Sequence, residues 1–145
     1  MRAHSRVRIS NVSLEPIELY LREEDPPDDT VVVLRGGPIV AEKVLEHAQR
    51  EARAYSLGGL PLYSVSVSLA VDGWSVDRLL AGPLASRSTY AVTTLGSLRA
   101  ARFLALPTFA SPHHDIVMES GGYDEASRLL RMFSESLPNP YKRRR

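Results

Sequence analysis

The chain has 145 residues, of which 43% are hydrophobic and 24% charged. These proportions match one ordinary globular domain and exclude a disordered tail, a collagen-like fibre and a coiled coil. The formal net charge is only +1, which disfavours a uniformly basic nucleic-acid domain but not a local basic patch. Because there is no cysteine, disulfides, thiol nucleophiles and cysteine-ligated metal sites are excluded.

The first half of the chain predicts two strands and one long helix. Ile17, Leu19 and Leu21 alternate with polar residues, as in a half-buried strand. Residues 30–34 form an apolar, β-branched run that is typical of a strand covered on both faces. A helix is expected over residues 38–56, where apolar side chains recur about every four positions after Pro38.

The second half predicts further alternation of strands and helices. In the clearest strand, residues 62–71, valines alternate with serines. We expect a short helix capped by Ser75 and ending at Leu80, strands at 88–93 and 114–119, and helices at 97–104 and 124–137. Together these elements predict an α+β fold with a mixed, largely antiparallel β-sheet flanked by about three to four helices.

No secretory signal or membrane span is recognisable. The basic head of the chain is not followed by an apolar stretch of about 7–15 residues. No stretch approaches the roughly 18 apolar residues of a membrane span. We therefore expect a cytoplasmic protein without a membrane partner, built as one globular domain over residues 1–137 with a basic tail over residues 138–145.

The first candidate site is the turn Arg35-Gly36-Gly37-Pro38, between a buried strand and the long helix. Two glycines would let a ligand approach the backbone, and free N–H groups at a helix start attract an anion. Arg35 adds a forked donor that suits phosphate or carboxylate. The alternative interpretation is a tight turn with a surface arginine.

The second candidate is a row of small hydroxyls on one strand, formed by Ser64, Ser66 and Ser68 with Tyr63 beside it. Serines suit a position where a ligand or another backbone comes close, although a simple polar strand face would look the same. There is no Gly-x-Ser-x-Gly motif, so a serine hydrolase fits poorly.

The third candidate is the run from His113 and His114 through Asp115 to Glu119. Histidine is the usual acid or base near neutral pH. Two adjacent histidines on a strand point to opposite faces, so His113 shares a face with Asp115 and His114 does not. No helical metal-ligand motif accompanies them, and we expect no metal. His47, on the long helix, is interpreted as a boundary residue.

Two charged segments have a simple explanation as solvated surface. One is an acidic loop over residues 23–29. The other is the basic tail, whose functional interpretation is contact with nucleic-acid phosphates. Its basic residues are Lys142, Arg143, Arg144 and Arg145.

Taken in chain order, these motifs resemble an ADP-ribosyltransferase-type fold. Residues 33–37, Val-Leu-Arg-Gly-Gly, resemble the family's arginine motif, and residues 64–68, Ser-Val-Ser-Val-Ser, resemble its serine-rich strand, with Ser66 the central match. Glu119 corresponds to the glutamate on a late strand. Val117 stands two positions before it, where a glutamate or glutamine serves transfer to arginine.

The resemblance implies NAD as a substrate. Arg35 and the glycine turn would hold the diphosphate, Ser66 would orient a ribose or amide, and Tyr63 or Tyr90 would stack on nicotinamide. Glu119 would face the positive charge that develops at the anomeric carbon. By resemblance to the members of that family that carry a histidine in the site, His113 or His114 would have a catalytic role.

Three functions follow as hypotheses. The first is a small NAD-using ADP-ribosyltransferase or NAD glycohydrolase, acting as the toxin of a bacterial toxin–antitoxin pair with the antitoxin as its protein partner. The second is a metal-independent ribonuclease toxin or RNA-binding protein that uses the basic tail. The third is a non-catalytic protein-interaction module.

Overall fold

The computed structural model describes residues 15–36, 39–119 and 122–142. The described residues form four helices and nine strands, and the antiparallel pairing of the main sheet confirms the predicted α+β class. Within them, no helix is long and apolar enough to cross a membrane. The helices are α2 (Ala41–Ala54), α3 (Val76–Ala81), α4 (Leu95–Ala100) and α5 (Tyr123–Leu130).

The main sheet has six strands, and every neighbouring pair in it is antiparallel. A small second sheet pairs β1 (Ile17–Glu18) in parallel with β3 (Tyr55–Leu57), which pairs in turn with β4 (Leu60–Pro61). In spatial order, the strands of the main sheet are β7 (Ala105–Leu106), β8 (His113–Val117), β5 (Ser64–Leu69), β2 (Val31–Gly36), β6 (Thr89–Thr94) and β9 (Leu137–Pro138).

Alternate residues of β2 supply two apolar cores on opposite faces of the sheet. Val32 and Leu34 pack with α2, α4 and α5 in the larger core. Val33 packs in the smaller core with Leu79 and Leu80 of α3. Burial of one such side chain stabilises the fold by about 1.5–3 kcal/mol. The prediction that this strand is covered on both faces is therefore confirmed.

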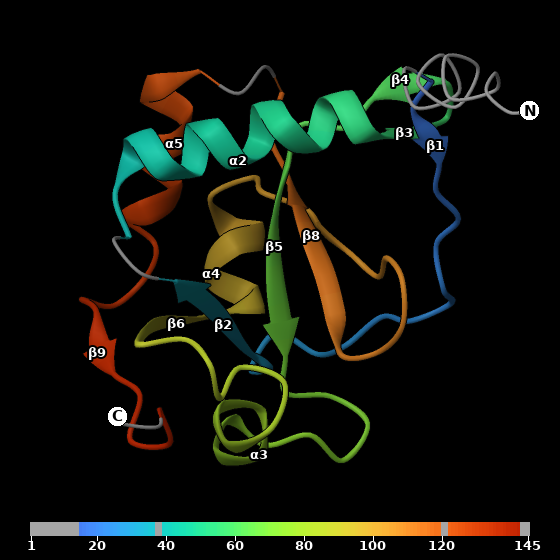
Figure 1. The fold of residues 1–145 in the computed structure, drawn as a ribbon. Helices are drawn as coiled ribbons and strands as arrows, with labels where there is room; N and C mark the ends of the chain where they lie inside the picture. Colours follow the sequence, from blue (N-terminus) through green and yellow to red (C-terminus); the bar gives the residue numbers. More distant parts are fainter. Residues whose placement is uncertain (1–14, 37–38, 120–121, 143–145) are drawn as a thin grey trace, which may run out of the picture.

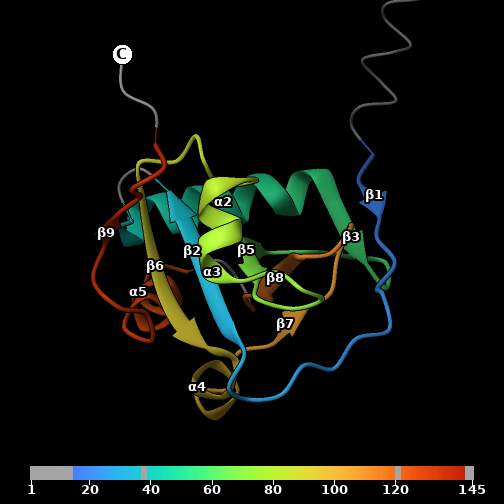
Figure 2. The same ribbon diagram turned by 90° about the horizontal axis from the view of Figure 1, so that it is seen from below.

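The sheet is strongly curled, and β2 and β5 separate along their length. Figures 1 and 2 show β2 and β6 crossing the direction of β5 and β8 at a steep angle, with α2 passing over one end of β5. The ladder between β2 and β5 consists of two pairs, Val32 with Leu69 and Val33 with Ser68. Continued in register, it would pair Arg35 with Ser66. The strands diverge before that point.

Several predicted elements are shorter than the sequence pattern suggested. The strand expected around residues 17–22 is reduced to β1 and an isolated bridge between Leu21 and Thr108. The last helix ends at Leu130, and Leu137, the expected last residue of that helix, pairs instead with Tyr90 of β6. The late strand β8 ends at Val117, before Glu119 is reached.

The segment after β9 is packed against the domain. The buried Asn139 donates from its side-chain amide to the carbonyl oxygens of Leu80 (3.4 Å), Leu84 (3.0 Å) and Arg87 (3.1 Å). Lys142 donates from Nζ to the Ser86 carbonyl at 3.0 Å. The beginning of the predicted tail thus forms part of the folded unit, whereas residues 143–145 lie outside the described residues.

Candidate functional site

A pocket of about 440 Å³ opens between β2, β5 and the first turns of α2. Its wall contains the neighbours Leu34 and Arg35 of β2 and the neighbours Val65 and Ser66 of β5. Neighbouring residues of a strand point to opposite faces of a sheet. A pocket that touches both members of each pair therefore lies in the opening between the two strands, where their ladder has ended.

The polar wall of this pocket is predominantly cationic. Lys43 is opposed by the one carboxylate of the lining, since its Nζ lies 3.6 Å from Oε1 of Glu46. Among the described residues, the guanidinium groups of Arg35, Arg50 and Arg87 form neither an ion pair nor a hydrogen bond. Three adjacent positive charges without a partner favour an anionic ligand, and forked guanidinium donors match phosphate geometry.

Arg35 is the most enclosed of these cations. Burial, followed by repulsion from Arg87, lowers the pKa of Arg35, and the half-buried Glu51 opposes this effect. An arginine keeps its proton at neutral pH despite such a shift. Its charge is consequently less stable than in water, and a bound anion would relieve both the desolvation and the repulsion.

A buried carboxylate lies directly behind the pocket. Asp115 is fully buried and pairs with Ser66 across the β5–β8 ladder. It accepts hydrogen bonds from the hydroxyls of Ser64 (3.2 Å), Ser66 (3.5 Å) and Thr108 (2.6 Å). The serine row is buried around this carboxylate. Because Ser66 directs its proton to Asp115, its oxygen lone pairs remain available to a ligand in the pocket.

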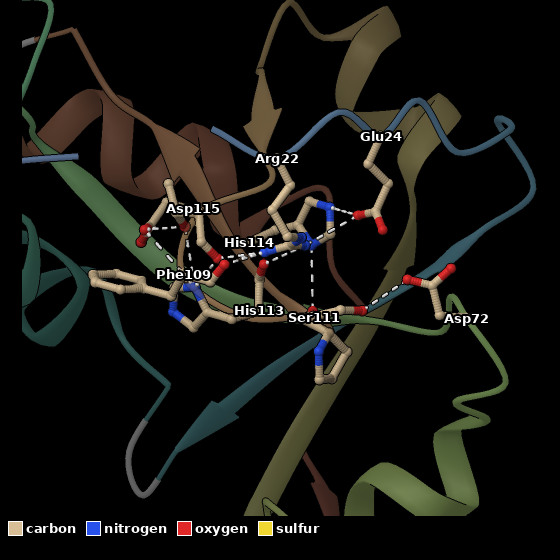
Figure 3. A network of polar contacts seen from close by, with 10 residues as sticks. Arg22, Glu24, Asp72, Phe109, Ser111, His113, His114 and Asp115 are labelled. Atoms are coloured by element: carbon tan, nitrogen blue, oxygen red, sulfur yellow. Dashed lines mark hydrogen bonds and ion pairs between the residues drawn. The ribbon is translucent and has the colours of Figure 1, made fainter. Parts of the chain in front are cut away.

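His113 belongs to the same polar cluster (Figure 3). Its Nδ1 lies 3.0 Å from Oγ1 of Thr108 and 4.0 Å from Oδ2 of Asp115. The ring stands edge-on to Phe109, with 5.0 Å between the ring centroids. Burial lowers the pKa of His113, although the Asp115 carboxylate acts in the opposite direction. The predicted shared face of His113 and Asp115 is confirmed.

His114 points away from that cluster and is buried near Glu24 (Figure 3). Its Nδ1 contacts the Pro112 carbonyl at 3.2 Å, and its Nε2 lies 2.8 Å from Glu24 Oε1 without hydrogen-bond geometry. Burial lowers the pKa of His114, whereas the Pro112 carbonyl and Glu24 raise it. Neither His113 nor His114 is among the residues that line the pocket.

Arg22 holds the segment before β2 onto this region. Its guanidinium donates to the carbonyls of Thr108 (2.7 Å), Phe109 (2.8 Å) and His113 (3.1 Å), and pairs with Glu24 at 3.1 Å. No local sequence pattern signals these contacts, because they join residues about 90 positions apart in the chain.

The structure brings together only part of the predicted cofactor site. Arg35, Gly36 and Ser66 line the pocket, while Ser64 and Ser68 are buried beside it and Gly37 lies outside the described residues. Tyr63 packs against the larger apolar core and Tyr90 against the smaller one. Neither tyrosine ring is part of the pocket lining.

Glu119 lies in a different hollow from Arg35 and Ser66. It is exposed beyond the end of β8, and the lining it shares includes the α5 residues Tyr123, Glu125 and Arg128. Its backbone N–H donates to Oε2 of Glu125 at 2.7 Å. The expected grouping of Arg35, Ser66 and Glu119 fails because the register of β8 places Asp115 opposite Ser66, and Glu119 lies four residues farther along, beyond the end of the strand at Val117.

His47 is half-buried on α2, in agreement with its interpretation as a boundary residue, and it also lines the pocket. Its Nε2 is buried and has no hydrogen-bond partner among the described residues. The spacing of polar residues on this helix indicates the position of His47. Lys43, His47 and Arg50 are spaced four and three positions apart, which places them on one helix face beside the apolar stripe.

In the described part of the chain, no group of three or more histidine and carboxylate residues could hold a metal ion. Comparison of the chain with protein families, with curated proteins and with solved structures gives no match.

Proposed function

We propose that the pocket between β2 and β5 binds NAD and that the protein cleaves the bond between nicotinamide and ribose, as an NAD glycohydrolase or ADP-ribosyltransferase. Arg35, together with Arg50 and Arg87, holds the diphosphate. Ser66 accepts a hydrogen bond from a ribose hydroxyl or from the carboxamide. Binding and positioning of the two halves of the dinucleotide then supply much of the rate enhancement.

One observation carries this proposal: three arginines whose guanidiniums have no partner among the described residues line the opening between β2 and β5. The volume of about 440 Å³ lies within the range of roughly 300–1,000 Å³ that is usual for small-molecule sites. The site therefore combines positive charge for a diphosphate with space for part of a dinucleotide. The motif resemblance, in which this arginine and this serine flank NAD, agrees with the same assignment.

The test is nicotinamide release from NAD by the full chain, followed chromatographically. Arg35→Ala should lower the rate at subsaturating NAD by about 10- to 150-fold, as expected for loss of a charge-assisted contact. Arg53→Ala is the matched control, because Arg53 is an exposed arginine on α2 that does not belong to the pocket lining. Equal rates for the two variants would contradict the proposal.

RNA is the alternative substrate to NAD, because the same guanidiniums could hold a phosphodiester. Incubation with total RNA, with and without NAD, separates the two. Cleavage of RNA that is independent of NAD, without any nicotinamide release, would replace the NAD proposal with the ribonuclease hypothesis.

A further inference from the structure

His47, which lines the pocket, has an imidazole nitrogen without a hydrogen-bond partner among the described residues. Nε2 of His47 is buried and unpartnered among the described residues, yet the side chain lines an open pocket. A buried polar atom without a hydrogen bond costs stability, so a native protein keeps one where a ligand or a water completes it. Among the described residues, His47 is the histidine of the pocket wall, and no other group there partners its Nε2.

The surroundings of His47 favour its neutral form. Burial lowers the pKa of His47 most, and the positive charges of Arg50 and Arg35 lower it further. Asp115, from β8, raises it, and His113 from the same strand lowers it. Lys43 and Glu46 on α2 and Arg87 line the same pocket. A neutral imidazole carries one unprotonated nitrogen and can accept a proton.

Other carboxylates and imidazoles nearby are less available for proton transfer. Glu46 is exposed and lies 3.6 Å from the Lys43 ammonium. Asp115 is fully buried and already accepts three hydroxyl hydrogen bonds. Glu51 and His113 are absent from the pocket lining. His47 is thus the pocket residue with an uncommitted basic atom.

We infer that His47 is the general base that activates water for hydrolysis of NAD, an inference that rests on the proposed function. The water oxygen forms a bond to C1′ of the nicotinamide ribose, and His47 takes a proton from that water. The bond between C1′ and the nicotinamide nitrogen breaks, and its electron pair neutralises the pyridinium. The products are ADP-ribose, neutral nicotinamide and the proton held by His47.

Because water is the nucleophile in this step, the assignment makes the protein an NAD glycohydrolase rather than an ADP-ribosyltransferase. The same guanidiniums serve two purposes, because they bind the diphosphate and disfavour a second positive charge on the imidazole. His47 therefore remains a base at neutral pH, where a histidine with an ordinary pKa would already be partly protonated.

The test compares His47→Ala and His47→Gln with Gln49→Ala, an exposed substitution on the same helix. We expect kcat for nicotinamide release to fall by about 10²- to 10⁴-fold in both His47 variants. The Kd for NAD, measured by calorimetry, should change by no more than about threefold, since the base acts mainly in the transition state. Gln49→Ala should behave as wild type.

Two further readouts separate a base from a structural residue. Added imidazole should restore activity to His47→Ala in proportion to its neutral form, and the acidic limb of the wild-type kcat profile should be missing in His47→Gln. Unchanged kcat, absence of rescue, or loss of NAD binding parallel to the loss of rate would overturn the assignment while leaving the NAD proposal intact. Wild type that neither binds nor cleaves NAD would overturn both.

Discussion

At the scale of single residues, the three described histidines have different positions and share one electrostatic property. His47 faces the pocket, His113 the Asp115 cluster, and His114 the carboxylate of Glu24. Burial is the largest cause that lowers the pKa of each imidazole. All three therefore favour the neutral form more strongly in the folded chain than in the unfolded one.

This difference predicts that the protein loses stability in mild acid. An unfolded histidine has a pKa of about 6.5, so below that pH the unfolded chain binds more protons than the folded chain. The stabilising contribution is present above pH 6.5 or so and is lost as the pH falls towards the folded-state pKa values. Between pH 7.5 and 6.0, we expect the free energy of unfolding in urea to fall by roughly 1–2 kcal/mol.

The control for this prediction is His47→Gln, which removes one of the three groups and should make the decrease smaller. The narrow pH range avoids most carboxylate titration. A free energy of unfolding that stays constant or rises between pH 7.5 and 6.0 would contradict the account of the buried imidazoles.

At the scale of elements, the local hydrophobic pattern of the sequence predicts most strands of the main sheet, and long-range pairing determines the rest. The β-branched run and the valine–serine alternation placed β2 and β5 to within a few residues, and Ser75 caps α3 through the Arg78 N–H, as predicted. The short strands β7 and β9 are defined by their pairing with the longer strands β8 and β6, and two-residue elements leave no periodicity to detect.

The site was partly predictable for the same reason. Arg35 and Ser66 stood out because each is unusual in its own strand, and the structure brings both to one pocket. The residues that α2 contributes to the pocket form a polar helix face in the sequence, but that pattern alone does not indicate a binding site. Whether Glu119 would join them depended on the register of β8 against β5, which places Asp115 and not Glu119 opposite Ser66 and which no local pattern encodes.

The contact between α4 and the acidic loop gives a prediction that opposes helix propensity. Gly96, the second residue of α4, donates its N–H to the Asp28 carbonyl at 2.8 Å. A Cβ at this position would lie 2.9 Å from the Asp28 Cβ and 3.1 Å from its carbonyl oxygen. Gly96→Ala should therefore destabilise the protein by about 1–3 kcal/mol in urea unfolding, although alanine normally favours a helix by roughly 1 kcal/mol.

Gln49→Ala, at an exposed helical position, serves as the comparison and should be neutral or slightly stabilising. If Gly96→Ala proved as stable as wild type, the loop over residues 25–29 would not be held against α4 as closely as described.

At the scale of the whole molecule, the sheet consists of two halves that meet at a short ladder. One half contains β2 with β6 and β9, and the other contains β5 with β8 and β7. They are joined by the pairs Val32–Leu69 and Val33–Ser68. The pocket occupies the place where the ladder would otherwise continue, so a ligand there contacts both halves and α2 together.

The central claim is that this opening binds NAD through contacts between its arginines and the diphosphate. A calorimetric titration of the full chain with NAD tests this claim most directly. We expect one site per chain, with Arg35→Ala weakening NAD binding by about 10- to 150-fold and Arg53→Ala leaving the affinity at the wild-type value. Absence of NAD binding by the wild-type chain, or equal affinities for Arg35→Ala and Arg53→Ala, would contradict it.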